Sequence, residues 1–279
     1  MIRLRIGELA TPHRKRSLRA KRPWLRRVAA VLLLQAVLLV QAGCLYPEER
    51  RVGQEPSTAF LQEVQGAVDR FRQAEGVLPI QTRPADTPRY EKYPIDFRQL
   101  VPRFLAEVPP NAFEQGGRYQ YVLIDVETAP QVRLLDLTVA AAVNEVQAAV
   151  TRYWKERGVL PIRDVKPTGF YGIDYAALHL QPVQVKSPYT GQYLPLLMDP
   201  WGRVGVDYAL DLVRLLPKDA DAARLPQDLR DFLARNHPFV PVRAFPYRLV
   251  RGEPVPLPQG FAFSPVINPT VPHIFVLSN

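Results

Sequence analysis

Residues 63–80 read Glu-Val-Gln-Gly-Ala-Val-Asp-Arg-Phe-Arg-Gln-Ala-Glu-Gly-Val-Leu-Pro-Ile, and residues 145–162 read Glu-Val-Gln-Ala-Ala-Val-Thr-Arg-Tyr-Trp-Lys-Glu-Arg-Gly-Val-Leu-Pro-Ile. The two stretches align without a gap and end on the same Gly-Val-Leu-Pro-Ile. Self-similarity at a fixed spacing is typical of a duplicated structural unit. We therefore predict two tandem repeated modules, residues 58–138 and 139–213.

Each module is predicted to open with an amphipathic helix. Apolar residues recur at steps of three and four over residues 60–71 and 139–154, which places them on one face of a helix. Both patterns end at a glycine, Gly76 and Gly158, and glycine readily adopts the left-handed conformation that closes many helices.

Each module is predicted to close with a β-hairpin. In the first module residues 119–126 and 132–137 are the expected strands. In the second, residues 193–198 and 204–208 flank the turn sequence Asp199-Pro-Trp-Gly202. The predicted fold class is α+β, with each module formed by an N-terminal helix packed on a small antiparallel sheet.

Residues 214–279 differ from the modules in composition. A short helix is predicted at Pro226–Arg235, because proline is favoured in the first turn of a helix. From Pro238 onward prolines alternate with apolar residues, and proline cannot donate a hydrogen bond within a central strand. We expect this Pro-rich C-terminal segment to pack along the modules, with the alternative that its end, from residue 255, is loose.

The first 43 residues are typical of an export signal. Residues 1–27 carry ten Lys or Arg and one acidic residue, and residues 28–43 form an uncharged, mostly apolar run of 16. Such a helix is roughly 24 Å long, shorter than the ~30 Å hydrocarbon core of a bilayer. Small residues directly before Cys44 favour cleavage between Gly43 and Cys44. The alternative is an uncleaved membrane anchor.

The stretch Val40-Gln-Ala-Gly-Cys44 resembles the lipobox of bacterial lipoproteins. Gln41 departs from that pattern, which usually has an aliphatic residue there. The resemblance implies that Cys44 is lipidated and becomes the new N-terminus. Residues 45–57 are polar and have no apolar periodicity, so we expect residues 44–57 to form a tether. Cys44 is the chain's one cysteine, so no internal disulfide competes for it. The expected location is extracytoplasmic, with a lipid anchor in the outer face of the cytoplasmic membrane.

The net charge of the chain comes from its signal segment. The whole sequence has 36 basic and 27 acidic residues and a net charge of +9. Residues 1–43 hold ten of the bases and one of the acids, so the mature part is formally neutral. Nucleic-acid binding needs a basic surface, and we therefore predict no nucleic-acid partner.

Residue types that carry common catalytic and metal sites are scarce in the mature part. Its histidines, His179, His237 and His273, are far apart in sequence, which argues against a zinc site. None of its four serines lies in a Gly-x-Ser-x-Gly motif, and no glycine-rich phosphate loop is present. We predict no catalytic residues, no cofactor and no metal. The alternative for a metal is a calcium site of carboxylates near the second hairpin, namely Asp199, Asp207 and Asp211.

Carboxylates also occur at matched positions of the two modules. Glu63 matches Glu145, and Asp96 matches Asp174. Such pairs can meet across a two-fold interface, as glycosidase acids or ligands of a hard metal do. The favoured interpretation is structural, with the aspartates as helix N-caps and the glutamates in a first helical turn.

Aromatic side chains are the candidates for a binding surface. The modules contain more of them than two small cores need, and exposed aromatics mark recognition sites. The alternative is that most are buried. We name five candidates: Tyr93, Tyr121, Tyr171, Tyr193 and Trp201.

Five stretches resemble an uncharacterised lipoprotein family of spore-forming Gram-positive bacteria: residues 44–49, 93–97, 119–127, 187–191 and 238–241. The resemblance implies a lipoprotein of the cytoplasmic membrane that faces the cell wall. It transfers no catalytic residue. The second module also resembles the globular heads of type II secretion pseudopilins, through its Gly-x-x-Pro and Asp-Pro-Trp-Gly motifs, and this second resemblance implies a shared topology alone.

The sequence thus predicts a non-enzymatic interaction or structural module, anchored at the cell envelope through lipid on Cys44. Its expected partner is an envelope protein or the cell wall. One alternative is a solute-binding lipoprotein associated with a transporter, with a cleft between the modules. Another is a carboxylate-based hydrolase of cell-wall glycans.

Overall fold

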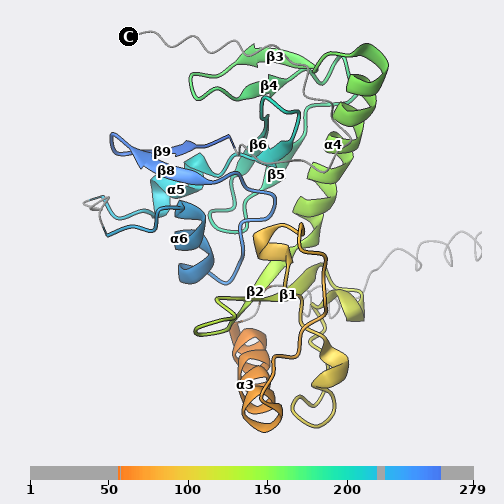
Figure 1. Ribbon diagram of the computed structural model, residues 1–279, viewed down its shortest axis with the longest axis vertical. Coiled ribbons are helices and arrows are strands. Elements are labelled where there is room, and N and C mark those ends of the chain that lie inside the picture. The colour runs from red at the N-terminus through yellow and green to blue at the C-terminus, as the bar shows by residue number, and fades with distance from the viewer. Residues whose placement is uncertain (1–55, 57, 219–223, 259–279) are drawn as a thin grey trace, which may run out of the picture. The chain divides into compact units, whose positions relative to one another are not determined.

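The computed structural model describes residues 56, 58–218 and 224–258, all within one compact unit (Figure 1). The predicted signal peptide, the cleavage point at Gly43 and Cys44, and all but one residue of the tether lie outside the described residues. So does the end of the chain from residue 259. No helix among the described residues is long and apolar enough to cross a membrane.

The described part is α+β, as predicted. Its four α-helices are α3 (Thr58–Glu75), α4 (Leu137–Arg157), α5 (Ala209–Leu215) and α6 (Leu229–Asn236). Its strands form small antiparallel sheets. They are β1 (Tyr119–Ile124), β2 (Gln131–Asp136), β3 (Ile162–Val165), β4 (Tyr171–Ile173), β5 (Gln184–Lys186), β6 (Tyr193–Met198), β7 (Val204–Val206), β8 (Tyr247–Val250) and β9 (Glu253–Pro256).

Helices α3 and α4 confirm the two predicted amphipathic helices. Each buries its apolar stripe, with Val64 and Val68 fully covered in α3 and Val146 in α4. Each ends before a glycine in the left-handed conformation, at φ 74° for Gly76 and 71° for Gly158. The glycine stops are therefore read correctly from the sequence.

The extended segments after each helix pair in the same order. After α3, Ile80 bridges Ile95, Pro94 bridges Val122 of β1, and β1 pairs with β2. After α4, β3 pairs with β4, β4 with β6, and β6 with β7. Both predicted hairpins, β1–β2 and β6–β7, are present and antiparallel.

A glutamine on each helix holds the hairpin that follows it. The side-chain oxygen of Gln65 accepts a hydrogen bond from the N–H of Val132 (2.7 Å), and its amide donates to the carbonyl of Pro130 (3.1 Å). Gln147 accepts from the N–H of the first residue of β7 (2.8 Å) and donates to the carbonyl of Gly202 (2.9 Å).

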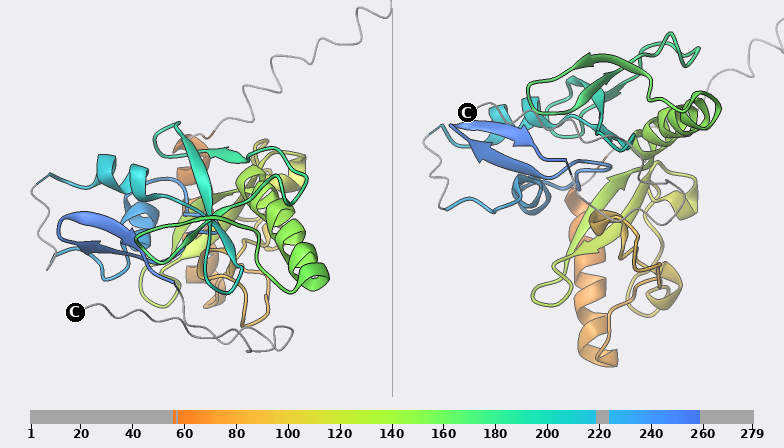
Figure 2. Two further views of the ribbon diagram at one scale, coloured as in Figure 1. Left: turned by 90° about the horizontal axis from the view of Figure 1, so that it is seen from above. Right: turned by 45° about the horizontal axis from the view of Figure 1, so that its top comes forward.

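Helix α6 begins later than predicted. The side chain of Asp228 accepts a hydrogen bond from the N–H of Arg230 (3.0 Å) and so caps a helix that starts at Leu229. Pro226 therefore precedes the helix instead of lying in its first turn. Helices α5 and α6 pack on the β8–β9 hairpin, which the sequence analysis did not predict (Figure 2).

Residues 238–244 lie along both earlier hairpins. Leu134 of β2 donates its N–H to the carbonyl of Pro238 (2.8 Å). Val206 of β7 donates its N–H to the carbonyl of Arg243 (3.1 Å). Both contacts are parallel bridges, so one proline-rich segment borders the outer strand of each hairpin.

Buried side chains form two main clusters. The first gathers α3, β1 and β2 and includes Phe239 from the C-terminal segment. The second gathers α4, β6 and β7 and includes Val240, Val242 and Tyr247 from the same segment. The C-terminal segment thus contributes to both cores.

Candidate functional site

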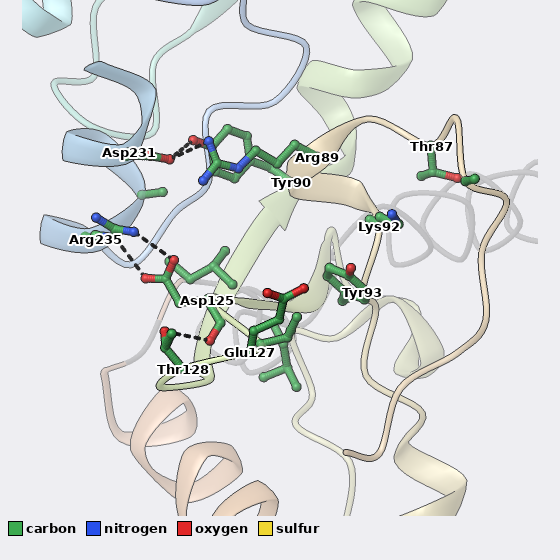
Figure 3. Close-up of a pocket in the computed structure, with 15 residues that line it drawn as sticks. Thr87, Arg89, Tyr90, Lys92, Tyr93, Asp125, Glu127, Thr128, Asp231 and Arg235 are labelled. Carbon is green, nitrogen blue, oxygen red and sulfur yellow. Dashed lines mark hydrogen bonds and ion pairs between the residues drawn. The ribbon is translucent and has the colours of Figure 1, made fainter. Parts of the chain in front are cut away.

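A pocket of about 530 Å³ opens between three segments that are distant in sequence (Figure 3). They are residues 85–93, which contain a short 3₁₀ turn, the end of β1 with its turn at residues 123–128, and α6. Small-molecule sites in proteins measure about 300–1,000 Å³. The pocket therefore has the size of a ligand site.

Six charged side chains line the pocket, three of each sign: Arg89, Lys92, Arg235, Asp125, Glu127 and Asp231. Four of them form ion pairs. The guanidinium of Arg235 donates to both carboxylate oxygens of Asp125, each at 2.9 Å, and Arg89 Nη1 lies 3.1 Å from Asp231 Oδ1. Lys92 and Glu127 have no hydrogen bond or ion pair with any residue in the part of the chain that the structure describes. One open cation and one open anion thus remain.

The wall that carries Arg89 and Lys92 is held in place by contacts of Tyr90 and Glu91 with other segments. Tyr90 is buried between them and donates its hydroxyl to Asp231 Oδ1 (2.5 Å). Burial raises the pKa of the Tyr90 hydroxyl, which therefore stays protonated as a donor. The next residue, Glu91, places a carboxylate oxygen 3.2 Å from Nε of Arg243. This wall is therefore positioned before any ligand arrives.

The turn that carries Asp125 and Glu127 is fixed as well. Asp125 adopts φ 51°, a left-handed conformation that aspartate tolerates better than most residues. Its backbone carbonyl accepts hydrogen bonds from the N–H groups of Thr128 and Ala129, both at 3.1 Å. The hydrogen bonds from Arg235 hold the pKa of the Asp125 carboxyl below its usual range. Non-glycine residues in the left-handed backbone conformation, such as Asp125, cluster at binding and catalytic sites.

The structure does not gather the five predicted aromatic candidates. Tyr93 is half-buried and lines the pocket. Tyr121 is 1% exposed and donates its hydroxyl to Asn111 Oδ1 (2.7 Å), because its position on β1 faces the core, so it is not part of a surface. Tyr171 is half-buried against the second core. Tyr193 and Trp201 are exposed, at 65% and 45%, but neither lines the pocket.

The matched carboxylates serve different purposes. Asp96 accepts a hydrogen bond from the N–H of Arg98 (3.2 Å), and Asp174 accepts one from the N–H of Ala177 (3.1 Å), so both cap short turns as predicted. Glu63 and Glu145 are exposed in the middle of their helices. Their predicted place in a first helical turn is wrong, since each helix begins earlier than that placement requires.

The three aspartates near the second hairpin do not converge. Asp199 bonds Arg203 in its own turn, Asp207 accepts from the hydroxyl of Tyr247 (2.8 Å), and Asp211 accepts from Ser187 Oγ (2.6 Å). No group of three or more His, Cys, Asp or Glu that could hold a metal ion occurs among residues 56, 58–218 and 224–258.

The pocket could not be predicted from the sequence, for a physical reason. Asp125 and Glu127 lie within residues 119–127, one of the stretches with a family resemblance, and Tyr93 is one of the five aromatic candidates. The opposite wall, however, is α6, and Arg235 is 110 residues away from its partner Asp125. No local pattern reports a contact at that separation.

Comparisons with known proteins bear on one part of this site. A search of curated proteins and a search of solved structures each found no match for the chain. Residues 57–136, which supply two of the three walls of the pocket, match the family model described as the YphF family N-terminal domain.

Proposed function

We propose that this protein is an extracytoplasmic lipoprotein, anchored through Cys44 to the outer face of the cytoplasmic membrane, and that its folded part is a non-enzymatic interaction module. The signal segment and lipobox support the location. The observation that carries the interaction role is the charged pocket at residues 85–93, 123–128 and α6. Its walls are fixed by buried contacts, while two of its charges remain open to a partner.

We infer further that residues 58–138 and 139–213 are a duplicated pair and that residues 238–244 of the C-terminal segment join them. Gln65 and Gln147 occupy matching positions of the sequence repeat and make matching hydrogen bonds to the hairpin that follows. The same C-terminal segment runs beside the outer strand of both hairpins. The walls of the pocket also share one buried cluster, which contains Tyr90 and Ile124 on one side and Ala234 of α6 on the other.

The charges of the pocket favour binding over catalysis. A carboxylate-based hydrolase needs one carboxyl whose pKa is raised, so that it can donate a proton near neutral pH. Asp125 has the opposite environment, since Arg235 lowers the pKa of its carboxyl. Asp231 is engaged by both Tyr90 and Arg89.

A solute-binding lipoprotein is the second candidate. The volume of the pocket, within the range of small-ligand sites, is the observation that favours it. The two candidates differ in what occupies the pocket, a segment of a partner or a free molecule.

Cross-linking in the native cell tests the interaction role. We expect mass spectrometry to identify a partner captured by the wild-type protein and lost from the double variant Lys92→Gln, Glu127→Gln. The control is Glu145→Gln with Lys155→Gln, which changes the same charges at exposed positions of α4. Equal capture by both double variants would count against the pocket as the interaction site.

The anchor has its own test. We expect the protein extracted from membranes to begin at Cys44 with acyl chains attached, and Cys44→Ala to release it from the membrane fraction. An unmodified N-terminus upstream of Gly43 would instead support an uncleaved anchor.

A further inference from the structure

The pocket contains two neutral ion pairs and two charges without an ion-pair partner among the described residues. On the α6 side, Arg235 with Asp125 and Arg89 with Asp231 neutralise each other. Figure 3 shows the carboxylate of Glu127 turned toward the space between Asp125 and Tyr93. Lys92 comes from the facing loop. Its ammonium lies over the ring of Tyr93, 5.6 Å from the centroid, and makes no hydrogen bond or ion pair with the described residues.

The two open charges do not neutralise each other. No ion pair within 4.0 Å joins Lys92 to Glu127, although both line the same pocket. A ligand that carried a carboxylate alone would satisfy Lys92 and be repelled by Glu127. A ligand that carried an ammonium alone would pair with Glu127 and be repelled by Lys92. A ligand with both groups satisfies both open charges.

The rest of the lining suits a peptide. Tyr93, Leu123 and Val126 offer apolar surface between the charges, and Thr87 and Thr128 add hydroxyls. An extended chain spans about 3.3–3.6 Å per residue, so the charged ends of a dipeptide are separated by at most roughly 7 Å. A pocket of about 530 Å³ has room for such a molecule.

We propose that the pocket binds a short zwitterionic peptide, with the free ammonium of the peptide on Glu127 and its carboxylate on Lys92. This assignment rests on the proposed binding role of the pocket and adds the chemical class of its ligand. Tyr90, Glu91 and Arg243 position the Lys92 wall, and Arg235 positions the turn that carries Glu127.

The test uses the mature lipidated protein in detergent micelles and titration calorimetry. The probes are the dipeptide Ala-Ala, its N-acetyl form, which lacks the ammonium, and its C-terminal amide, which lacks the carboxylate. We expect saturable binding of Ala-Ala and about tenfold weaker binding of each blocked form, since the loss of one charge contact of ~1.4 kcal/mol is a factor of ten in affinity.

The variants assign each contact. Glu127→Gln is expected to remove the preference for Ala-Ala over its N-acetyl form and to retain the preference over the amide. Lys92→Gln is expected to do the reverse. The controls, Glu145→Gln and Lys155→Gln, lie outside the pocket and are expected to bind like the wild type.

Three results would overturn the assignment: no saturable binding of Ala-Ala, equal binding of Ala-Ala and a blocked form by the wild type, or pocket variants that behave like the controls. Cross-linking in the cell distinguishes a failure of the ligand assignment from a failure of the proposed interaction role. A partner lost in the pocket variants, with no peptide binding, would leave the interaction role standing and remove the ligand class. Peptide binding without a captured partner would favour the solute-binding candidate.

Discussion

Asp211 is a fully buried carboxylate that joins α5 to the loop at residues 187–191. It accepts hydrogen bonds from Ser187 Oγ (2.6 Å) and Thr190 Oγ1 (2.5 Å). Ser187 Oγ in turn accepts from the N–H groups of Tyr189 and Thr190, at 3.0 and 3.1 Å. Burial raises the pKa of Asp211, and these hydroxyl donors offset only part of that effect. The serine therefore links the loop at residues 187–191 to a buried acid of α5.

The first prediction concerns Asp211→Asn. Because the pKa of Asp211 is raised on folding, its contribution to stability is complete below the unfolded pKa of 3.8 and is lost as pH rises through the folded value. Asparagine does not titrate. We therefore expect the free energy of unfolding of the wild type, minus that of the variant, to fall as pH rises from 3 to 7. Urea denaturation of both proteins at several pH values measures this difference in unfolding free energy. A difference that stayed constant with pH would contradict the prediction.

The second prediction concerns Asp125→Asn and has the opposite sign. Arg235 lowers the folded pKa of Asp125, so its stabilising contribution is present above the unfolded pKa of 3.8 and is lost as pH falls through the folded value. Asparagine keeps the tolerance for the left-handed backbone. The same urea series is expected to give a wild-type advantage that grows from pH 2 to pH 5. If the stability advantage of the wild type changed with pH in the same direction for Asp125→Asn and Asp211→Asn, the pKa values of the two aspartates would not be shifted in opposite directions.

Individual residues were predictable where a local rule decides them. Asp96 and Asp174 precede short turns, and an aspartate there bonds the backbone two or three residues ahead. Tyr121 was not predictable in this way. Apolar residues of β1 lie on both faces of the strand, Leu123 on the face of Tyr121 and Val122 and Ile124 on the other, so alternation did not indicate which face is covered.

Elements were predictable where the periodicity is long. Helices α3 and α4 each carry an apolar stripe over several turns and a glycine stop, and both were found. The β8–β9 hairpin was missed, because Pro254 and Pro256 argue against a strand. The sequence did carry a turn signal in Gly252, and the structure places Arg251 and Gly252 at positive φ, 51° and 84°, as a two-residue hairpin turn requires.

The third prediction tests whether the two helix–hairpin units are equivalent. Gln65→Ala and Gln147→Ala each leave one strand N–H without its side-chain acceptor, at a cost of about 1–3 kcal/mol. We expect similar losses of unfolding free energy for both variants in chemical denaturation. Gln73→Ala, at an exposed position of α3, is the control and should change stability little. A large cost at Gln65 with none at Gln147 would argue against a duplicated design.

At the scale of the whole described chain, the arrangement depends on residues 238–244. Repeats and amphipathic patterns predict each unit by itself, because they report local contacts. They contain no information on which later segment borders β2 and β7, since those pairings join residues far apart in the chain. For the same reason the sequence patterns predicted a helix near α6 but neither its position beside residues 85–93 and 123–128 nor the pocket that it completes.

The last prediction uses Phe239 to test whether residues 238–244 couple the two helix–hairpin units. Its side chain is 6% exposed in the first core and packs against Tyr119, with ring centroids 5.7 Å apart. Phe239→Ala is expected to cost about 3–5 kcal/mol, as for other buried phenylalanines. The informative readout is hydrogen exchange at two amides, Leu134, which donates to Pro238, and Val206, which donates to Arg243. If the segment couples both units, exchange accelerates at both amides. If only Leu134 responds, the segment does not couple the two units, and the contact of Val206 with Arg243 is stable without the side chain of Phe239.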